Sequence, residues 1–305
     1  MFVYTRPFAV KDDLAAVLDL LLACRAADTV DDWPPLIELR LMLTSKALDQ
    51  QDTCLWEQAD GALAAFGLLL DRVYLIAFVD PQANQRDLHE QTLLWAMERV
   101  KTLEQTPGEP AILSVSVRED DIERRALVNG YSFELKDWQT LRMACALDTS
   151  LPEPALPAGC AIRPLAGEQE VARYLAVHHE AFPDSNLTRE ERLSLMRDSA
   201  YLPALDLVMT GPDGAFAAFC TCSFSVEENT RLGRRDGWVD LVGTRPELRG
   251  RGLGRAALLA GLRQLRTQGA NRALLGTQST NSAQRLYTSV GFHVIHKLRW
   301  YTKAL

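Results

Sequence analysis

The sequence predicts an α/β protein made of two similar halves, each a mixed sheet with helices between its strands. One observation is that short apolar runs alternate with amphipathic helical segments, the strands outnumbering the helices. The other is that segments near the N-terminus recur about 160 residues later, which indicates a tandem duplication. A length of 305 residues also exceeds the usual size of one domain.

The repetition extends over the whole chain. TRPFAVKDDLAAVLDLL near the N-terminus corresponds to AIRPLAGEQEVARYLAV from residue 161, and LRMACAL corresponds to LRWYTKAL at the C-terminus. Between the copies, residues 150–159 (SLPEPALPAG) have the prolines that are typical of a linker. We therefore expect one domain at residues 1–149 and a second at residues 160–305.

The elements of the second half follow from its apolar spacing. Strands are expected at 161–163, 205–210, 215–225, 238–244, 273–277 and from 292 onward. Helices are expected at 168–181, 188–198, 253–268 and 282–289. Thr188 with Glu191 forms a capping box, and Gly269 suits the residue after a helix end. Glu227 and Glu228 are expected in a solvated hairpin turn.

Composition excludes several classes of function. The net charge of −7 argues against general binding to nucleic acid or to an anionic membrane, and no apolar run is long enough for a signal peptide or a membrane span. Six scattered cysteines suggest free thiols in a reducing cytoplasm. His178 and His179 lack metal-ligand spacing, so they are expected at the surface or in capping, and no metal is expected.

A glycine-rich turn precedes the helix expected at 253–268. In RGRGLGRAALLAGLRQL, residues 249–265, glycines at 250, 252 and 254 alternate with arginines at 249, 251 and 255. A helix start has unpaired N–H groups and partial positive charge, and residues without Cβ allow close approach to them. This pattern indicates a phosphate site, best suited to a pyrophosphate.

Three other interpretations of this turn were considered. A dinucleotide-binding fingerprint starting at Gly252 would need an acidic residue about 20 positions later, but the next strand ends LLGTQST without a carboxylate. A Walker A loop would need a lysine where Arg255 stands. The third interpretation is a plain glycine turn with solvated arginines, and only the surrounding sequence argues against it.

Residues 238–292 resemble the signature of the GNAT superfamily of acyl-CoA-dependent N-acyltransferases. The signature comprises a strand, an R-x-x-G-x-G turn, a helix, a second strand and then an N-x-x-A-x-x-L-Y-x-x-x-G-F string. This chain matches the string, with one shift, at Asn281, Ala283, Leu286, Tyr287, Gly291 and Phe292. The resemblance implies two tandem GNAT-like domains, each a mixed, mostly antiparallel sheet flanked by helices.

The resemblance also implies a binding mode for acetyl-CoA. The pyrophosphate would lie on the turn, and the pantetheine would lie along the preceding strand. The implied contact residues are Val242, Gly243, Thr244, Arg249, Gly250, Arg251, Gly252, Leu253, Gly254, Arg255 and Asn281. Tyr287 occupies the family's usual general-acid position, and a phenol with an ordinary pKa of about 10 is protonated at neutral pH.

The general base is less well defined by the sequence. Many family members have a glutamate where this chain has Trp238, and Asp240 lies two residues further on the same strand face. Asp240 could accept the amine proton, hold a cationic substrate or make a structural hydrogen bond. Trp238 and Asp184 are the candidates for contact with the acceptor.

The first half lacks the same chemistry. The residues from Asn84 to His89 replace the glycine turn, with Asp87 in place of a glycine, and Ala126 stands where the second half has Tyr287. We therefore expect one active site per chain, in the second half, with residual coenzyme binding by the first half left open.

Together these features predict a cytoplasmic acetyl-CoA-dependent N-acetyltransferase that acts on the primary amine of a small molecule, with no nucleic acid or membrane partner. The alternatives are an acetyltransferase of the aminoglycoside type, one that modifies a protein N-terminus, and a non-catalytic acyl-CoA sensor.

Overall fold

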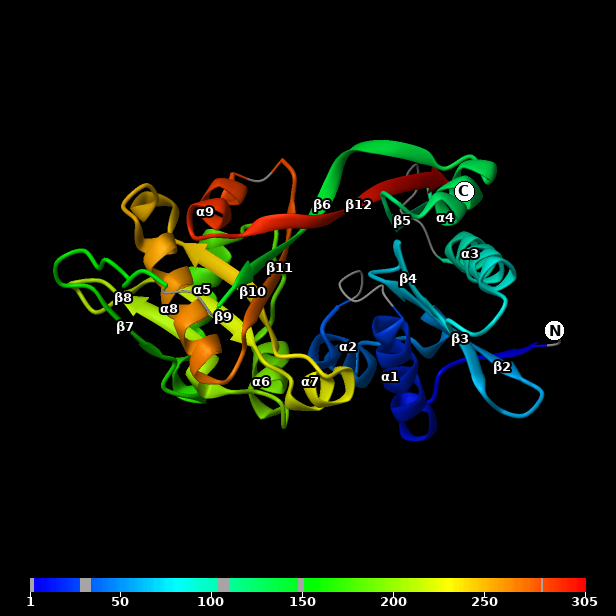
Figure 1. Ribbon diagram of the computed structural model, residues 1–305, viewed down its shortest axis with the longest axis horizontal. Coiled ribbons are helices and arrows are strands. Elements are labelled where there is room, and N and C mark those ends of the chain that lie inside the picture. Colours follow the sequence, from blue (N-terminus) through cyan, green and yellow to red (C-terminus); the bar gives the residue numbers. More distant parts are fainter. Residues whose placement is uncertain (1–2, 28–33, 104–109, 148–150, 281) are drawn as a thin grey trace. The chain divides into compact units, whose positions relative to one another are not determined.

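The computed structural model describes residues 3–27, 34–103, 110–147, 151–280 and 282–305. The chain forms two compact units (Figure 1). Unit 1 comprises Met1–Arg142, Gln278–Thr280 and His296–Leu305, and unit 2 comprises Met143–Thr277 and Asn281–Ile295. Both units combine strands and helices, which confirms the predicted α/β class.

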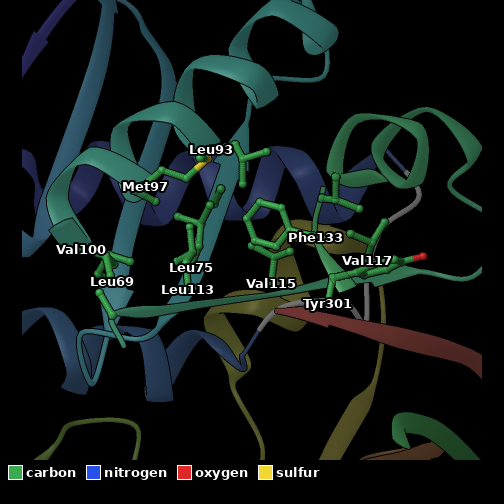
Figure 2. Packing of buried hydrophobic residues seen from close by; sticks show 14 residues of the cluster. Leu69, Leu75, Leu93, Met97, Val100, Leu113, Val115, Val117, Phe133 and Tyr301 are labelled. Carbon is green, nitrogen blue, oxygen red and sulfur yellow. The ribbon is translucent and has the colours of Figure 1, made fainter. Parts of the chain in front are cut away.

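Unit 1 has a mixed sheet with the strand order β1-β2-β3-β4-β5-β12, in which only β4 and β5 run parallel among the pairs with a described register. Its elements are β1 (Val3–Arg6), α1 (Val10–Ala26), α2 (Leu36–Thr44), β2 (Thr53–Gln58), β3 (Leu63–Leu70), β4 (Tyr74–Val79), α3 (Gln85–Thr102), β5 (Ile112–Arg118), α4 (Ile122–Gly130), the first part of β6 (Glu134–Ala146) and most of β12 (His293–Ala304). Figure 2 shows its core, where Leu93, Met97 and Val100 of α3 pack against Leu113 and Val115 of β5.

Unit 2 has the strand order β6-β11-β10-β9-β8-β7, and β10 and β11 run parallel. Its elements are β7 (Ala161–Pro164), α5 (Val171–Ala181), α6 (Arg189–Arg197), β8 (Asp206–Thr210), β9 (Phe216–Ser223), α7 (Val226–Leu232), β10 (Asp236–Thr244), α8 (Leu253–Thr267), β11 (Arg272–Gln278), α9 (Ala283–Ser289), the end of β6 and the start of β12. The Thr188–Glu191 capping box is present, and Gly269 has the positive φ expected after a helix. The predicted hairpin turn at Glu227 and Glu228 is wrong, because both residues lie in α7 and Glu228 is buried.

The two halves repeat a similar order of elements, as the duplicated sequence predicts, but among the described residues helix α7 between β9 and β10 has no counterpart between β3 and β4. In unit 1 the guanidinium of Arg6 donates two hydrogen bonds of 2.7 Å to Asp13, seven residues later. In unit 2 Arg163 donates two bonds of 2.7 Å to Glu170, again seven residues later. Both carboxylates also accept a backbone N–H four residues earlier, at 2.7 and 2.8 Å, so the same clamp fixes the first helix of each unit.

The last strands of the two halves each run through both units, because β6 passes into unit 2 after Arg142 and β12 passes into unit 1 at His296, so the unit boundaries are not those of the expected domains at 1–149 and 160–305. β12 pairs antiparallel with β5 in unit 1, with Tyr301 opposite Val115, whereas β6 neighbours β11 in unit 2. Both strands have similar sequences and equivalent positions in their repeats. Their apolar pattern therefore predicts a strand without specifying which sheet it joins.

Strand β9 is covered on both faces by helices of unit 2. Cys220 and Cys222 face α8, where a Cβ on Gly261 would lie 2.6 Å and 2.9 Å from their sulfurs. The alternate residue Phe219 packs against Tyr174 of α5, with ring centroids 5.0 Å apart. The predicted apolar stripe of α8 is fully buried, and Figure 1 shows this helix beside strands β8 to β10. Among the described residues, no helix combines the length and apolarity needed to span a membrane.

Candidate functional site

The turn between β10 and α8 requires glycine at two positions. Gly250 has φ +77° and Gly252 has φ +82°, conformations that residues with a Cβ rarely adopt. A Cβ at either position would have no atom within 4 Å, so the space beside the turn is open. The turn is therefore both glycine-dependent and accessible.

The start of α8 offers unpaired backbone donors. Its N-cap residue, Gly252, supplies no side-chain cap, and the first turn contains no acidic residue. The first backbone bond runs from Ala256 N to Gly252 O, at 3.0 Å. In the described part of the chain, the amides of residues 253–255 have no acceptor, and the helix dipole adds positive potential. These residues fit the diphosphate of a nucleotide coenzyme, because donors and open space coincide.

Gly254 is a glycine for a different reason. A Cβ there would lie 3.2 Å from Thr244 Oγ1 and 3.6 Å from Leu286 Cδ2. The missing side chain lets α8 approach the end of β10 and helix α9, which brings the turn close to the helix that carries Tyr287.

The three arginines of the turn are not equivalent. Arg249 donates from Nη2 to Ala181 O at 3.0 Å and from Nε to Thr244 O at 3.4 Å, so its guanidinium is engaged with the protein. Arg251 is exposed and Arg255 half-buried, and neither forms an ion pair within the described ranges. Arg249 is also exposed, but only Arg251 and Arg255 have guanidinium groups without a hydrogen bond to the described part of the protein.

Strands β10 and β11 diverge near the turn. Among the residues that the structure describes, they pair only where Asp236–Trp238 meets Arg272–Leu274, and β10 then continues to Thr244 paired with β9. The register with β9 shifts between Val239 and Leu241, so a bulge begins the divergent part. Val242, Gly243 and Thr244 lie in this part, so an extended ligand can bond to their strand edge as an added strand does. Gly243 also has a packing role, because its Cβ would lie 2.3 Å from the Phe219 ring.

Tyr287 lies on α9, next to Leu286. Its ring is half-buried and packs edge-on against Phe292, with centroids 6.0 Å apart. Burial raises the pKa of Tyr287 to about 12, and the nearby Cys220 thiol adds to the effect. The phenol therefore keeps its proton at neutral pH.

Asp240 is exposed on β10, at the bulge, and accepts a hydrogen bond of 3.0 Å from Ser223 Oγ. Because Ser223 is the cross-strand partner of Trp238, Asp240 and Trp238 share a face, as predicted. Trp238 itself is 6% exposed and packs with Ala144 and Leu274. The structure thus places Trp238 in the core, whereas Asp240 is accessible.

Two predicted site residues remain, Asp184 and Asn281. Asp184 is exposed in the segment between α5 and α6. Asn281 lies outside the described residues. The expectation that His178 lies at the surface is wrong, because the residue is 3% exposed and bonds through Nε2 to Ser185 Oγ at 2.9 Å. Burial lowers its pKa to about 4, and the four-residue spacing from buried Tyr174 was the signal that could have revealed its position.

The turn before α3 in unit 1, which corresponds to the glycine turn before α8, has a side-chain cap and no left-handed glycine. At the start of α3, Asn84 Oδ1 caps the amide of Asp87 at 3.5 Å, and Asn84 Nδ2 donates to the Asp87 carboxylate at 2.6 Å. No residue from 84 to 89 has a positive φ. His89 stands at the position of Gly254 and, with Arg124, lines a hollow between α3, α4 and the sheet. The helix start is thus capped by its own side chains and carries a carboxylate.

The described residues contain no cluster of three or more His, Cys, Asp or Glu side chains that could hold a metal ion, and each of the six cysteines is free.

Comparison with known proteins agrees with this geometry. The acetyltransferase (GNAT) family matches residues 171–292, which include the turn, the divergent strands and Tyr287. Mycothiol acetyltransferase from Frankia casuarinae is 33% identical over 162 residues, 50% of this chain and 46% of the relative. The enzyme of the same name from Pseudarthrobacter chlorophenolicus is 33% identical over 170 residues, 53% of this chain and 51% of the relative.

Two solved structures share the whole fold. A GCN5-related N-acetyltransferase from Sphaerobacter thermophilus superposes with a TM-score of 0.74 at 23% identity, over 99% of this chain and 95% of that one. A tandem GNAT protein from the clavulanic acid biosynthesis pathway superposes with a TM-score of 0.71 at 16% identity, over 99% and 98%.

Residues 171–292 therefore match the acetyltransferase (GNAT) family, and the chain shares the fold of solved GNAT structures, a tandem GNAT protein among them. The chain spans about half the length of the curated relatives it matches.

Proposed function

We propose that unit 2 transfers an acetyl group from acetyl-CoA to the primary amine of a small molecule. The observation that carries this proposal is the uncapped start of α8, which follows two left-handed glycines and lies beside the unpaired edge of β10. The amides of residues 253–255, with Arg251 and Arg255, would hold the diphosphate. The edge at 242–244 would hold the pantetheine, and Asn281 remains a proposed contact.

Acetyl-CoA supplies the acyl group as a thioester. As the amine nitrogen forms its bond to the carbonyl carbon and the C–S bond breaks, Tyr287 Oη donates its proton to the departing sulfur. Asp240 accepts the proton that the amine loses, directly or through a water molecule. Support for this assignment comes from the position of α9, whose Leu286 lies beside Gly254 of the glycine turn, and a phenol carries its proton at neutral pH. The exposure of Asp240 supports its contact with an acceptor.

For the acceptor we propose a polar amine of low molecular mass. Support comes from the name mycothiol acetyltransferase carried by relatives 33% identical over half of this chain. Asp240 and Asp184 are both exposed carboxylates in unit 2, and such groups attract a cationic amine. The buried Trp238, where many family members have a glutamate, argues that acceptor recognition differs from that of those members.

We further propose that unit 1 has no catalytic role. The capped start of α3, the carboxylate of Asp87 and the absence of left-handed residues at 84–89 leave no equivalent anion site. Ala126 cannot supply a proton in place of Tyr287. Calorimetric titration with CoA should therefore give one site per chain, and two equal sites would contradict the assignment.

The test of catalysis is release of free thiol from acetyl-CoA over a panel of amines that includes the mycothiol precursor and aminoglycosides. Tyr287→Phe should lower kcat about 10²- to 10⁴-fold, the usual contribution of a general acid, and leave the Kd of CoA unchanged. Tyr131→Phe, which removes a phenol in unit 1, is the matched control and should keep full activity. CoA binding without turnover on any amine would instead identify a sensor.

A further inference from the structure

The end of helix α5 is tied to the connection between β10 and α8 by two arginines. Arg249 donates to Ala181 O from Nη2, at 3.0 Å, and to Thr244 O from Nε, at 3.4 Å. Arg245 forms an ion pair with Glu180, with 3.2 Å between Nε and Oε2. The guanidinium of Arg249 thus joins the start of the glycine turn to the last residue of α5 and the last residue of β10.

These contacts satisfy groups that the α5 terminus leaves unpaired. The last carbonyls of a helix lack intrahelical partners, and the residue after α5, Phe182, has φ −131° and is not a left-handed glycine. The planar fork of a guanidinium suits two neighbouring carbonyls, and its charge suits the negative end of the helix dipole. Gly243 permits this approach, because a Cβ there would lie 3.1 Å from Ala181 Cβ.

The segment after α5, residues 182–187, depends on this last helical turn. His178 holds it through Ser185 Oγ at 2.9 Å, and His179 Nε2 bonds to Leu187 O at 3.0 Å. Both histidines belong to the turn that Arg249 caps. The segment carries Asp184, so the position of this exposed carboxylate depends on how firmly the end of α5 is held.

We propose that Arg249 is a positioning residue that couples coenzyme binding at the glycine turn to the order of the acceptor-side segment 182–187. This inference rests on the proposed function. Gly250 follows Arg249 directly, so a diphosphate held by the turn restrains the Arg249 backbone. The side chain of Arg249 passes that restraint to Ala181 through the hydrogen bond from Nη2 to Ala181 O. Coenzyme binding therefore prepares the segment for the amine.

The test is hydrogen–deuterium exchange of the full chain, with and without saturating CoA, combined with calorimetry. The amides of Phe182, Ser185 and Leu187 report on the segment, because each donates an internal hydrogen bond. We expect CoA to slow their exchange about 5- to 150-fold, the range of ordinary coupling between sites. Arg249→Gln should speed their exchange without CoA and abolish the slowing, with little change in the Kd of CoA.

Arg251→Gln is the matched control, since it removes the same charge from the same turn. It should weaken CoA binding and leave the segment unchanged without CoA, and saturating CoA should still slow exchange. Arg249→Lys should restore part of the effect, because an ammonium can bond to one of the two carbonyls.

Faster exchange of the segment on CoA binding would mean that the phosphates compete for Arg249, and unchanged exchange would mean that no coupling exists. Either result overturns the inference and leaves the proposed function intact. Failure of the unmodified protein to bind CoA would overturn both.

Discussion

The two ends of helix α8 provide a test of the phosphate site, because each end has a glycine with a positive φ. Gly252 at the start has φ +82°, and Gly269 after the end has φ +101°. A Cβ would meet no atom within 4 Å at either position. Replacing either glycine by alanine therefore perturbs backbone conformation alone, and only the Gly252 position adjoins the proposed diphosphate.

The cost of a left-handed conformation for a residue with a Cβ is about 1–2 kcal/mol. In Gly252→Ala the exposed turn can relax to another conformation, so the same 1–2 kcal/mol must be supplied when the coenzyme binds. At 1.4 kcal/mol per tenfold, CoA should bind about 5- to 30-fold more weakly. Gly269→Ala should lower the free energy of unfolding by about 1–2 kcal/mol and leave the Kd of CoA unchanged.

Calorimetric titration with CoA and thermal unfolding of both variants measure these effects. Equal CoA affinity in Gly252→Ala and the unmodified protein would show that the turn does not bind the diphosphate. Equal weakening in both variants would show that the loss arises from general destabilisation of α8.

Three further predictions follow from packing and protonation. Gly261→Ala should destabilise unit 2 by up to about 2 kcal/mol, because overpacking costs about 1–3 kcal/mol and the better helix propensity of alanine contributes about 1 kcal/mol of stability. When Cys220 and Cys222 are both replaced by alanine, the clash is removed and Gly261→Ala should stabilise unit 2 instead. A destabilising effect in both backgrounds would contradict the packing. The pKa of Glu170, lowered from 4.5 to about 2, contributes stability above pH 4.5 that is lost as the pH falls toward 2. Glu170→Gln should lack this decline in acid unfolding curves. Because the pKa of Tyr287 is about 12, its ionisation should cause no decline in rate up to pH 10; a decline near pH 8 that Tyr287→Phe abolishes would contradict this pKa.

Features that depend on a few neighbouring residues could be predicted from the sequence. The left-handed glycines at 250 and 252, the capping box at Thr188 and the glycine after α8 are present because short-range sterics and hydrogen bonding determine them. The duplication was equally predictable, since it is a pattern along the chain. Tyr287 could be assigned a role only through the family resemblance, and that role stays a prediction.

Features that depend on distant contacts could not be predicted. Arg249 looks like a phosphate ligand in the sequence, yet its partner Ala181 lies 68 positions away. Trp238 looks like an acceptor contact, but its neighbours on β6 and β11 bury it. His178 looks like a surface residue and is buried against Phe219.

Local sequence patterns were enough to predict most strands and helices of the second repeat and the backbone donors at the start of α8, because these follow from local propensity and from side chains that are absent. The sheet that each part of the last strands joins, the arginines whose guanidinium groups stay free of hydrogen bonds to the described part of the protein, and the exposure of the polar side chains became clear from the three-dimensional structure alone. Those outcomes depend on packing between segments far apart in the chain. Local sequence cannot distinguish them, because two similar strands, or two arginines in one turn, have the same local chemistry.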